Sequence, residues 1–292
     1  MAEDDRNDAG WRTLFDGETL HGWHTEPRTY GALYPGGPSA LTILDRLGLP
    51  RPVEPELHPA AWHVEDGHIV GQQSEPGNGY GGYLVSDETF GDFELTFEAR
   101  PDWPADTGVM VRRRPLDWTG FQILIDHREH GSIGGFFGNG LASFSAAPFA
   151  LRSKCDGSGQ VIGLIADTPE TSPWPVTQDK IDRLNHACDV NDFLRVWRWG
   201  DWNEFRIKVV GDLPTITTWV NGLKVAELDT ATMTSPNYDP DAVLAFLGVR
   251  GHIAFEVHDN DPMMGESRWG VGARCRWRSI RIRLLPEGAR PG

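Results

Sequence analysis

The sequence predicts an all-β fold in which two antiparallel sheets pack face to face as a sandwich. Apolar and polar residues alternate strictly through residues 93–100, which is typical of a strand with one buried face. Asn221 and Gly222 stand between two β-prone runs, and both residues tolerate the positive φ that a tight hairpin requires. Similar short runs recur along the chain, and their number suits two sheets.

Within residues 93–100, the odd-numbered apolar residues are expected to face the core. Glu94 and Glu98 then point to the opposite face, because successive side chains of a strand alternate between its two sides. Further strands are expected wherever such a run returns. These runs cover residues 109–113, 121–125, 205–210, 216–220, 252–257 and 277–285.

Three stretches interrupt the strand pattern, at residues 24–60, 128–198 and 259–273. The first contains one helix-like run, residues 40–47, and the second opens with the glycine-rich residues 131–140. Loops longer than about 12–15 residues are uncommon unless they are functional or disordered, so we expect the rim of a binding site here. The chain is predicted to form one domain over residues 11–286, with insertions at about 24–60 and 128–198 and flexible ends at 1–10 and 287–292.

Composition narrows the class of protein. With 292 residues, 39% of them hydrophobic and 24% charged, the chain can bury a sizeable core. A net charge of -15 repels nucleic-acid phosphates and anionic lipids, so a neutral or cationic small molecule is the expected ligand. No apolar run reaches the ~18 residues of a membrane span, and the acidic start lacks a secretory signal. A cytoplasmic location is therefore expected.

The strand face opposite the core is unusually rich in charged side chains. Carboxylates, an imidazole and a guanidinium that meet on one concave sheet could supply a general acid, a general base and an anion stabiliser. The alternative is a solvated face, because antiparallel sheets often present one polar face to water. The candidates on this face are Glu98, Arg112, Gln122, Asp126, His127, Glu256 and His258.

Tryptophan residues favour a sugar ligand. The chain has 12 of them, and a Trp in a loop offers a flat apolar surface to the C–H face of a pyranose. Trp118 and Trp269 lie in or beside the predicted loops and are the candidate stacking residues. The alternative for either residue is a place in the core, where most Trp side chains are used.

A metal site is a weaker possibility. Asp126, His127 and His258 could offer oxygen and imidazole ligands to a divalent ion such as Ca, Mn or Mg. Their spacing matches no EF-hand loop and no HExxH helix, and a hydrated acidic loop is the alternative.

The three cysteines are odd in number and form no CxxC pair, so free thiols are expected rather than a disulfide framework or a structural zinc site.

Several short motifs occur in a fixed order along the chain, at segments 14–17, 22–23, 62–67, 82–84, 91–95, 108–112, 202–203, 219–222, 251–253 and 277–280. In number and order they resemble the family DUF1080, now called the 3-keto-disaccharide hydrolase domain. Some motifs depart from the family pattern: Asn-Ser-Gly is replaced by Asp106-Thr107-Gly108, Gln-x-His reads Glu-x-His and ends at His258, and Phe-Arg-Asn is replaced by Trp-Arg-Ser at 277–279. The register of Gln122 in its strand also differs from the family pattern by one or two residues.

The resemblance implies a concanavalin A-like jelly roll with a concave sugar-binding sheet, and activity on glycosides already oxidised at C3. A ketone at C3 acidifies the C2 proton, so a base and an acid can drive β-elimination, and water can then add to the enone. On this hypothesis the base is His258 or Asp126, and the acid is Glu98 or Glu256. Arg112 would clamp the enolate or a hydroxyl, a role that a divalent ion could also fill.

The remaining candidates, Gln122, His127, Trp118 and Trp269, are expected to bind substrate. The chief alternative function is a non-catalytic, lectin-like carbohydrate-binding module, since the same sandwich and aromatic rim suffice for capture. The required substrate also implies a functional partnership with a sugar 3-dehydrogenase. The oligomeric state is left open.

Overall fold

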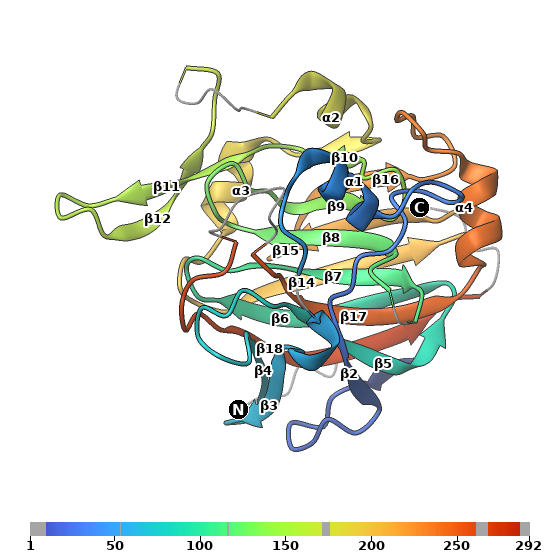
Figure 1. Ribbon diagram of the computed structural model, residues 1–292. Helices are drawn as coiled ribbons and strands as arrows, with labels where there is room; N and C mark the ends of the chain where they lie inside the picture. The colour runs from blue at the N-terminus through green and yellow to red at the C-terminus, as the bar shows by residue number, and fades with distance from the viewer. Residues whose placement is uncertain (1–9, 53, 116, 171–175, 261–267, 287–292) are drawn as a thin grey trace.

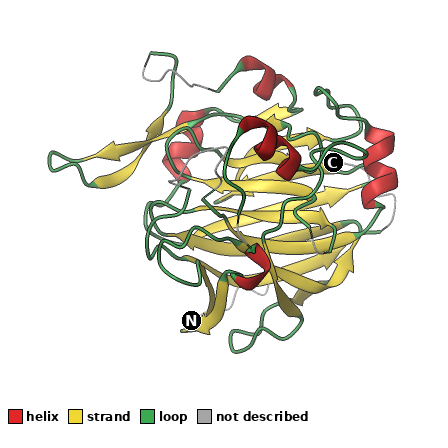
Figure 2. Ribbon diagram, viewed as in Figure 1, coloured by secondary structure: helices red, strands yellow, loops and turns green. Residues whose placement is uncertain are grey.

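The computed structural model describes residues 10–286 except for residues 53, 116, 171–175 and 261–267. The predicted fold class is confirmed, because two antiparallel sheets pack face to face and short helices lie at their edges (Figures 1 and 2). The flexible ends predicted at 1–10 and 287–292 lie, apart from Gly10, outside the described residues.

The larger sheet has nine strands, eight of them in one continuous order, with β1 (Trp11–Thr13) paired to β18 off this path. All of its pairings are antiparallel. The order is β13 (His186–Ala187), β16 (Leu223–Asp229), β15 (Thr215–Val220), β14 (Asn203–Val210), β6 (Phe93–Pro101), β18 (Cys275–Leu284), β4 (His68–Gln72) and β3 (Ala61–Glu65).

The smaller sheet has seven strands and carries the site described below. A separate two-stranded hairpin, β11 (Leu151–Cys155) and β12 (Val161–Ala166), projects away from the sandwich in Figure 1. The order in the seven-stranded sheet is β10 (Ser145–Ala146), β9 (Ile133–Asn139), β8 (Gly120–Asp126), β7 (Asp106–Arg113), β17 (Gly251–Val257), β5 (Gly82–Phe90) and β2 (Trp23–Pro27).

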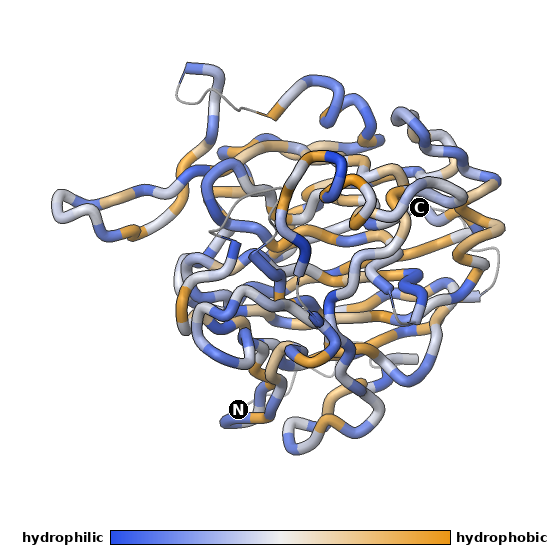
Figure 3. Tube along the Cα trace, viewed as in Figure 1, coloured by the Kyte–Doolittle hydropathy of each residue, from blue (hydrophilic) through white to orange (hydrophobic). Residues whose placement is uncertain are grey.

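The core fills the space between the two sheets. Phe97 of β6 stacks on Phe205 of β14 with ring centroids 5.1 Å apart, and it meets Phe255 of β17 across the sandwich at 5.6 Å. All three rings are buried, as the alternation along β6 predicts. Figure 3 shows the same alternation as apolar and polar segments that follow one another along the strands. Each such ring stabilises the fold by about 1.5–3 kcal/mol relative to an exposed one.

The tight hairpin predicted at Asn221 and Gly222 is confirmed. These two residues join β15 to β16 and have φ values of 47° and 84°. The side chain of Asn221 also accepts a hydrogen bond from the backbone N–H of Glu204, 2.9 Å away, and so ties the turn to β14. Sequence therefore predicts both the position and the backbone conformation of this turn.

The helix-like run in the first insertion is a helix, α1 (Ala40–Leu47). The side chain of Ser39 caps its start by accepting from the N–H of Leu41, and Gly48 ends it with φ of 65°. The other helical segments are η1 (Pro55–Leu57), α2 (Gln178–Asp182), α3 (Val190–Val196) and α4 (Pro240–Leu247).

The expectation of a long loop at 128–198 is wrong. This stretch contains β9 and β10 of the seven-stranded sheet, the projecting hairpin, α2, β13 and α3. Glycine hides the strand pattern of β9 because neighbouring groups leave no room for a side chain. A Cβ atom on Gly138 would lie 2.4 Å from the Phe144 ring, and one on Gly134 would lie 2.7 Å from Val225 Cγ1.

Two expectations about the whole chain can be compared with the structure. The three cysteines are free, as expected. None of the helices in the described ranges has the length and apolar character needed to cross a membrane.

Candidate functional site

A cavity of about 500 Å³ lies on the face of the seven-stranded sheet that is turned away from the core. Along β8 the core-facing Ile123 and Ile125 alternate with Gln122, Leu124 and Asp126, which line the cavity. Loops from both predicted insertions cover this face, so its polar side chains are buried although they lie outside the core. The volume falls in the range of about 300–1,000 Å³ that is usual for small-molecule sites.

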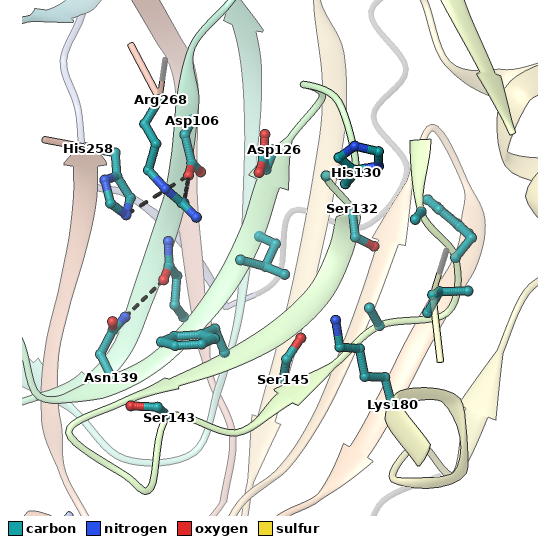
Figure 4. A pocket seen from close by; sticks show the side chains of 18 of the residues that line it. Asp106, Asp126, His130, Ser132, Asn139, Ser143, Ser145, Lys180, His258 and Arg268 are labelled. Atoms are coloured by element: carbon teal, nitrogen blue, oxygen red, sulfur yellow. Dashed lines mark hydrogen bonds and ion pairs between the residues drawn. The ribbon is translucent and has the colours of Figure 1, made fainter. Parts of the chain in front are cut away.

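Two carboxylates face one another at one end of the cavity (Figure 4). Asp106 of β7 and Asp126 of β8 are register partners on adjacent antiparallel strands. Arg128 Nη2 donates to both, at 3.0 Å to Asp106 Oδ2 and 2.8 Å to Asp126 Oδ2. Arg268 Nη1 also donates to Asp106 Oδ2. Two buried acids therefore share one guanidinium, and a second guanidinium holds Asp106 alone.

The pKa values of the two carboxyl groups shift in opposite directions. Burial raises the pKa of Asp126, and the charge of Asp106 opposite raises it further. Burial alone would also raise the pKa of Asp106, but the positive charges of His258, Arg268 and Arg128 outweigh it and hold that pKa at about 2. A pair of titratable groups separated in this way is the arrangement that acid–base catalysis uses.

Three polar atoms of lining residues have no hydrogen-bond partner among the described residues. They are Asp106 Oδ1, Ser132 Oγ and Arg268 Nε, and all three are buried. A buried polar atom without a partner is costly, by about 1–3 kcal/mol, so such atoms are uncommon unless a ligand or water completes them. Their presence in one cavity supports a polar ligand at this end.

Arg28 is the centre of a buried network behind the carboxylates. Its Nε donates to Asp259 Oδ1 at 2.9 Å, and its Nη1 donates to the hydroxyl of Tyr83 at 2.6 Å and to Glu256 Oε1. Gln122 Nε2 donates to the other oxygen of Glu256. The network fixes Gln122 and satisfies Glu256 and Asp259, so these two acids support the wall of the cavity.

His258 lies in the wall between this network and the carboxylate pair. Its Nδ1 is 2.7 Å from the carbonyl oxygen of Asp259, and its Nε2 is 3.2 Å from Arg28 Nη2 and 3.9 Å from Asp106 Oδ2. Nδ1–H therefore donates to that carbonyl, and Nε2 lies between Arg28 and Asp106. Both ring nitrogens are occupied, and the ring holds a fixed position.

A second histidine reaches the cavity from the turn that follows β8. His130 Nδ1 is 2.7 Å from Asp167 Oδ2, whose side chain is fully buried. His130 has a φ of 64°, a left-handed conformation that is uncommon outside glycine and is found at functional sites. Figure 4 shows its ring beside Ser132, on the side of Asp126 away from His258. A carboxylate thus orients this imidazole toward the cavity.

Residues 10–283 match the sequence model of the 3-keto-alpha-glucoside-1,2-lyase-like domain. The chain belongs to this family. The match confirms the resemblance seen in the sequence motifs, and it supports a carbohydrate-related function. None of the curated proteins compared with the chain matches it.

Three solved structures with related sandwiches are distant from this chain. Two Parabacteroides distasonis proteins assigned as glycosyl hydrolases have TM-scores of 0.45, one at 18% identity over 77% of this chain and 90% of its own, the other at 13% over 95% of each. The carbohydrate-binding module CBM66 from Bacillus subtilis has a TM-score of 0.41 at 10% identity, over 77% of this chain and 91% of its own. At these scores the similarities add nothing to the chemistry argued from the site.

Four residues predicted for this family site line the cavity: Gln122, Asp126, His258 and Trp118. The structure adds three groups that sequence reasoning did not assign to a catalytic or substrate-binding role. Asp106 stands out in the sequence only as a departure from the family's Asn, whereas Arg28 and His130 lie in stretches interpreted as loops. The left-handed turn around His130 leaves no periodic signal in the sequence.

The prediction that Glu98 shares a face with the other candidates is wrong. Glu98 lies on β6, in the nine-stranded sheet, on the face opposite the core. Its carboxylate accepts from Arg278 Nε at 2.8 Å and from Nη2 at 3.2 Å. Alternation assigns a residue to one face of its own strand, but it does not say which sheet the strand joins. Glu256 is on the correct sheet, but it is bound by Arg28 and Gln122 behind the cavity.

The prediction for Arg112 is also wrong. Its φ is 52°, and the pairing of β7 with β17 shifts register here, so the strand bulges and the side chain leaves the expected face. The Arg112 guanidinium donates to the carbonyls of Phe90 at 3.0 Å and Gly211 at 2.9 Å. The neighbouring Arg113 takes the outer face instead, where it donates to Glu26 at 2.6 Å.

His127 and Trp269 do not line this cavity. His127 packs beside Trp103 and Trp199, with ring centroids 5.3 and 5.7 Å away, on a second cavity of about 220 Å³. Burial lowers the pKa of His127 to about 4, and its Nε2 donates to the Asp102 carbonyl at 3.2 Å. Trp269 is buried in the core, and its indole N–H donates to the Ala273 carbonyl at 2.9 Å. Both residues serve as anchors for loops.

The three candidate metal ligands do not converge. Arg128 binds Asp126, Arg28 faces the Nε2 of His258, and His127 lies on the other cavity. Across the described ranges, no three His, Cys, Asp or Glu side chains are grouped so that they could hold a metal ion. The residues present therefore do not fit the divalent ion considered from the sequence, because guanidinium groups occupy the positions that a cation would take.

Proposed function

We propose that the protein cleaves the glycosidic bond of 3-keto-glycosides by removing the C2 proton and eliminating the leaving group. The observation that carries this proposal is the Asp106 and Asp126 pair, whose opposite pKa shifts meet in one cavity. An ordinary glycosidase would need two carboxylates on opposite sides of the anomeric carbon. Here the two lie side by side on adjacent strands, which suits proton transfer on one face of the sugar.

Asp126 acts as the base in this mechanism. The ketone at C3 acidifies the C2 proton, and the Asp126 carboxylate takes that proton while the electron pair moves to the C3 oxygen as an enolate. The raised pKa strengthens Asp126 as a base, because proton transfer is most efficient when the pKa of the base approaches the working pH. The guanidinium of Arg268, which also lines the cavity, faces the enolate charge.

His130 acts as the acid. The enolate electrons return to form the C1–C2 double bond, the bond between C1 and the glycosidic oxygen breaks, and the His130 imidazolium protonates the departing oxygen. Buried Asp167, with its Oδ2 2.7 Å from His130 Nδ1, holds the ring in position for this step. In hydration the sequence reverses: neutral His130 takes a proton from water as its oxygen adds to C1, and Asp126 returns a proton to C2. Net hydrolysis results, with both residues restored.

The substrate must be supplied by an oxidation at C3 of the parent glycoside. We therefore propose a functional partnership with a sugar 3-dehydrogenase that transfers the hydride from C3 to its own cofactor. This partnership follows from the chemistry of the substrate, and no surface of the chain is assigned to it.

The test is proton NMR in deuterated water with a 3-keto-glucoside, and with the parent glucoside as control. We expect cleavage of the keto compound alone, with deuterium appearing at C2 of the product. Treatment with a chelator should leave the rate unchanged, because arginine side chains fill the cation positions of the site. Binding of both sugars without turnover would instead establish the protein as a carbohydrate-binding module.

A further inference from the structure

The cavity has two unlike ends. Asp106, Asp126 and His258 lie together at one side in Figure 4, and Ser145 and Lys180 lie at the opposite side. Toward β9 and β10 the lining carries several apolar side chains among the polar Asn139, Ser143 and Ser145. The residues of this apolar part, called the apolar chamber from here on, are Leu33, Trp118, Leu124, Phe137, Phe149 and Val176.

The walls of the apolar chamber are held in place by the fold. Phe137 of β9 is the register partner of Gln122 on β8 and of Ser145 on β10, so strands on both sides fix its backbone. Phe149 packs on Phe193 of α3 with ring centroids 4.7 Å apart. The chamber is therefore a preformed surface, and a ligand does not have to order it.

Trp118 presents only carbon atoms to the chamber. Its indole N–H donates to the Ala32 carbonyl at 3.2 Å, and its ring meets Tyr30 edge-on with centroids 5.1 Å apart. The single polar atom of the side chain is thus already used. A hydroxyl placed against this wall would lose its water without gaining a partner, which costs free energy.

The cavity is too long for one sugar ring. From β17 to β10 the sheet spans four strand intervals, or roughly 19 Å at the usual spacing of about 4.8 Å. If the sugar that loses its C2 proton lies at the carboxylate end, its leaving group extends over Leu124 and Phe137. A second sugar in that place would set its hydroxyls against apolar side chains.

We propose that the apolar chamber binds the leaving group, and that this leaving group is an apolar, ring-bearing alcohol rather than a second sugar. This inference rests on the proposed function, since it names the substrate class of the same site. The chamber combines sheet and loop residues: β8 and β9 provide Leu124 and Phe137, residues 24–60 provide Leu33, and the segment after β10 provides Phe149 and Val176. The loops therefore complete the surface that contacts the leaving group.

The experiment compares two 3-keto-glucosides with the same sugar and anomer, one carrying cyclohexanol and the other glucose as leaving group. The two rings have similar shape, and the glucose alcohol is the more acidic, so leaving-group chemistry favours the disaccharide. We expect kcat/KM at least about tenfold higher for the cyclohexyl compound, the size of effect that apolar contacts give. Equal values, or a preference for the disaccharide, would overturn the inference.

Substitutions in the apolar chamber test whether its side chains determine the preference for the leaving group. Phe137→Ser should lower kcat/KM for the cyclohexyl compound more than for the disaccharide, and so remove most of the preference for cyclohexyl. Val176→Ser, which changes a residue outside the sheet, serves as a second variant if Phe137→Ser does not fold. Phe246→Ser is the matched control, because Phe246 is partly buried on α4 and does not line the cavity. A preference retained in both chamber variants contradicts the assignment.

If neither keto compound is cleaved, the proposed function fails. Binding measurements then test whether the apolar chamber prefers an apolar ring to a second sugar. Calorimetric titration would use cyclohexyl glucoside and the parent disaccharide, both unoxidised. Tighter binding of the cyclohexyl compound that is lost in Phe137→Ser supports the chamber, whereas equal or weaker binding overturns it.

Discussion

The outer faces of the two sheets both carry alternating charged side chains, but they lie in different surroundings. On the nine-stranded sheet, Glu98 accepts from Arg278 Nε at 2.8 Å, and the two side chains are 26% and 41% exposed. On the seven-stranded sheet, loops cover Asp106 and Asp126 and bury them. Water screens the first pair and is largely excluded from the second, so burial and neighbouring charges shift the pKa values of Asp106 and Asp126.

The largest expected difference between the two faces is in catalytic rate. Asp126→Asn removes the proposed base and should lower kcat on a 3-keto-glucoside by about 10²- to 10⁴-fold, the usual contribution of such a group. Glu98→Gln on the other sheet should leave kcat unchanged. Initial rates by NMR check both variants, and a rate retained in Asp126→Asn would remove this residue from the mechanism.

A stability difference of several kcal/mol is expected when one arginine is removed from each face. Arg28→Met leaves Glu256 and Asp259 buried without their partner and should lower the free energy of unfolding by about 3–5 kcal/mol. Arg278→Met breaks a partly exposed pair and should cost no more than about 1 kcal/mol. Urea unfolding of both variants makes the comparison. Equal losses would mean that the covering loops do not exclude water.

A pH-dependent loss of stability is expected from His127. Its pKa is about 4 in the folded protein, below the ordinary value of 6.5, because burial disfavours the charged ring. The unfolded chain therefore takes up a proton first as pH falls, and stability that is complete above about pH 6.5 declines until about pH 4. The loss is about 3 kcal/mol over this window.

His127→Phe tests this linkage, since a phenyl ring keeps the packing with Trp103 and Trp199 and cannot titrate. Urea unfolding at pH 7 and pH 4.5 should show a smaller decline for the variant than for the parent protein. Parallel declines would assign the pH dependence to other groups.

The smallest expected effect is a shift in a pH–rate profile. Asp106→Asn removes the negative charge that, after burial, raises the pKa of Asp126. The pKa of Asp126 should fall, so its carboxylate form persists to lower pH and the acidic limb of kcat moves to lower pH. Measuring kcat from pH 4 to 8 checks the direction. A shift to higher pH would show that Asp126 is not the titrating base.

Strand positions and the tight turn could be predicted because they depend on local patterns. The alternation along β6 and the Asn221 and Gly222 pair are properties of neighbouring residues. The strand β9 could not be predicted, because its Gly134 is required by contact with Val225 of β16, which is distant in sequence. Packing between residues far apart in the sequence determines where β9 has glycine, and such packing produces no periodic pattern in the sequence.

The candidate site was predictable only in part for a related reason. Asp126 and His258 follow from alternation on strands that join the same sheet, whereas Glu98 obeys the same pattern on the other sheet. Arg112 shows how one bulge reverses the face of a residue, because side chains alternate with a period of two. Predicting such a site requires the order of the strands, and alternation does not contain it.

The segment between β10 and β13, called the excursion here, connects the edges of the two sheets. It leaves from an edge strand of one sheet and returns to an edge strand of the other, so replacing it breaks no pairing between central strands. Long surface insertions also add little to the entropic cost of folding. Its hairpin projects from the body of the sandwich in Figure 1, while Phe149 and Val176 reach back into the cavity. This segment thus supplies two lining side chains and Asp167, the partner of His130, whereas the carboxylate pair lies on the sheet itself.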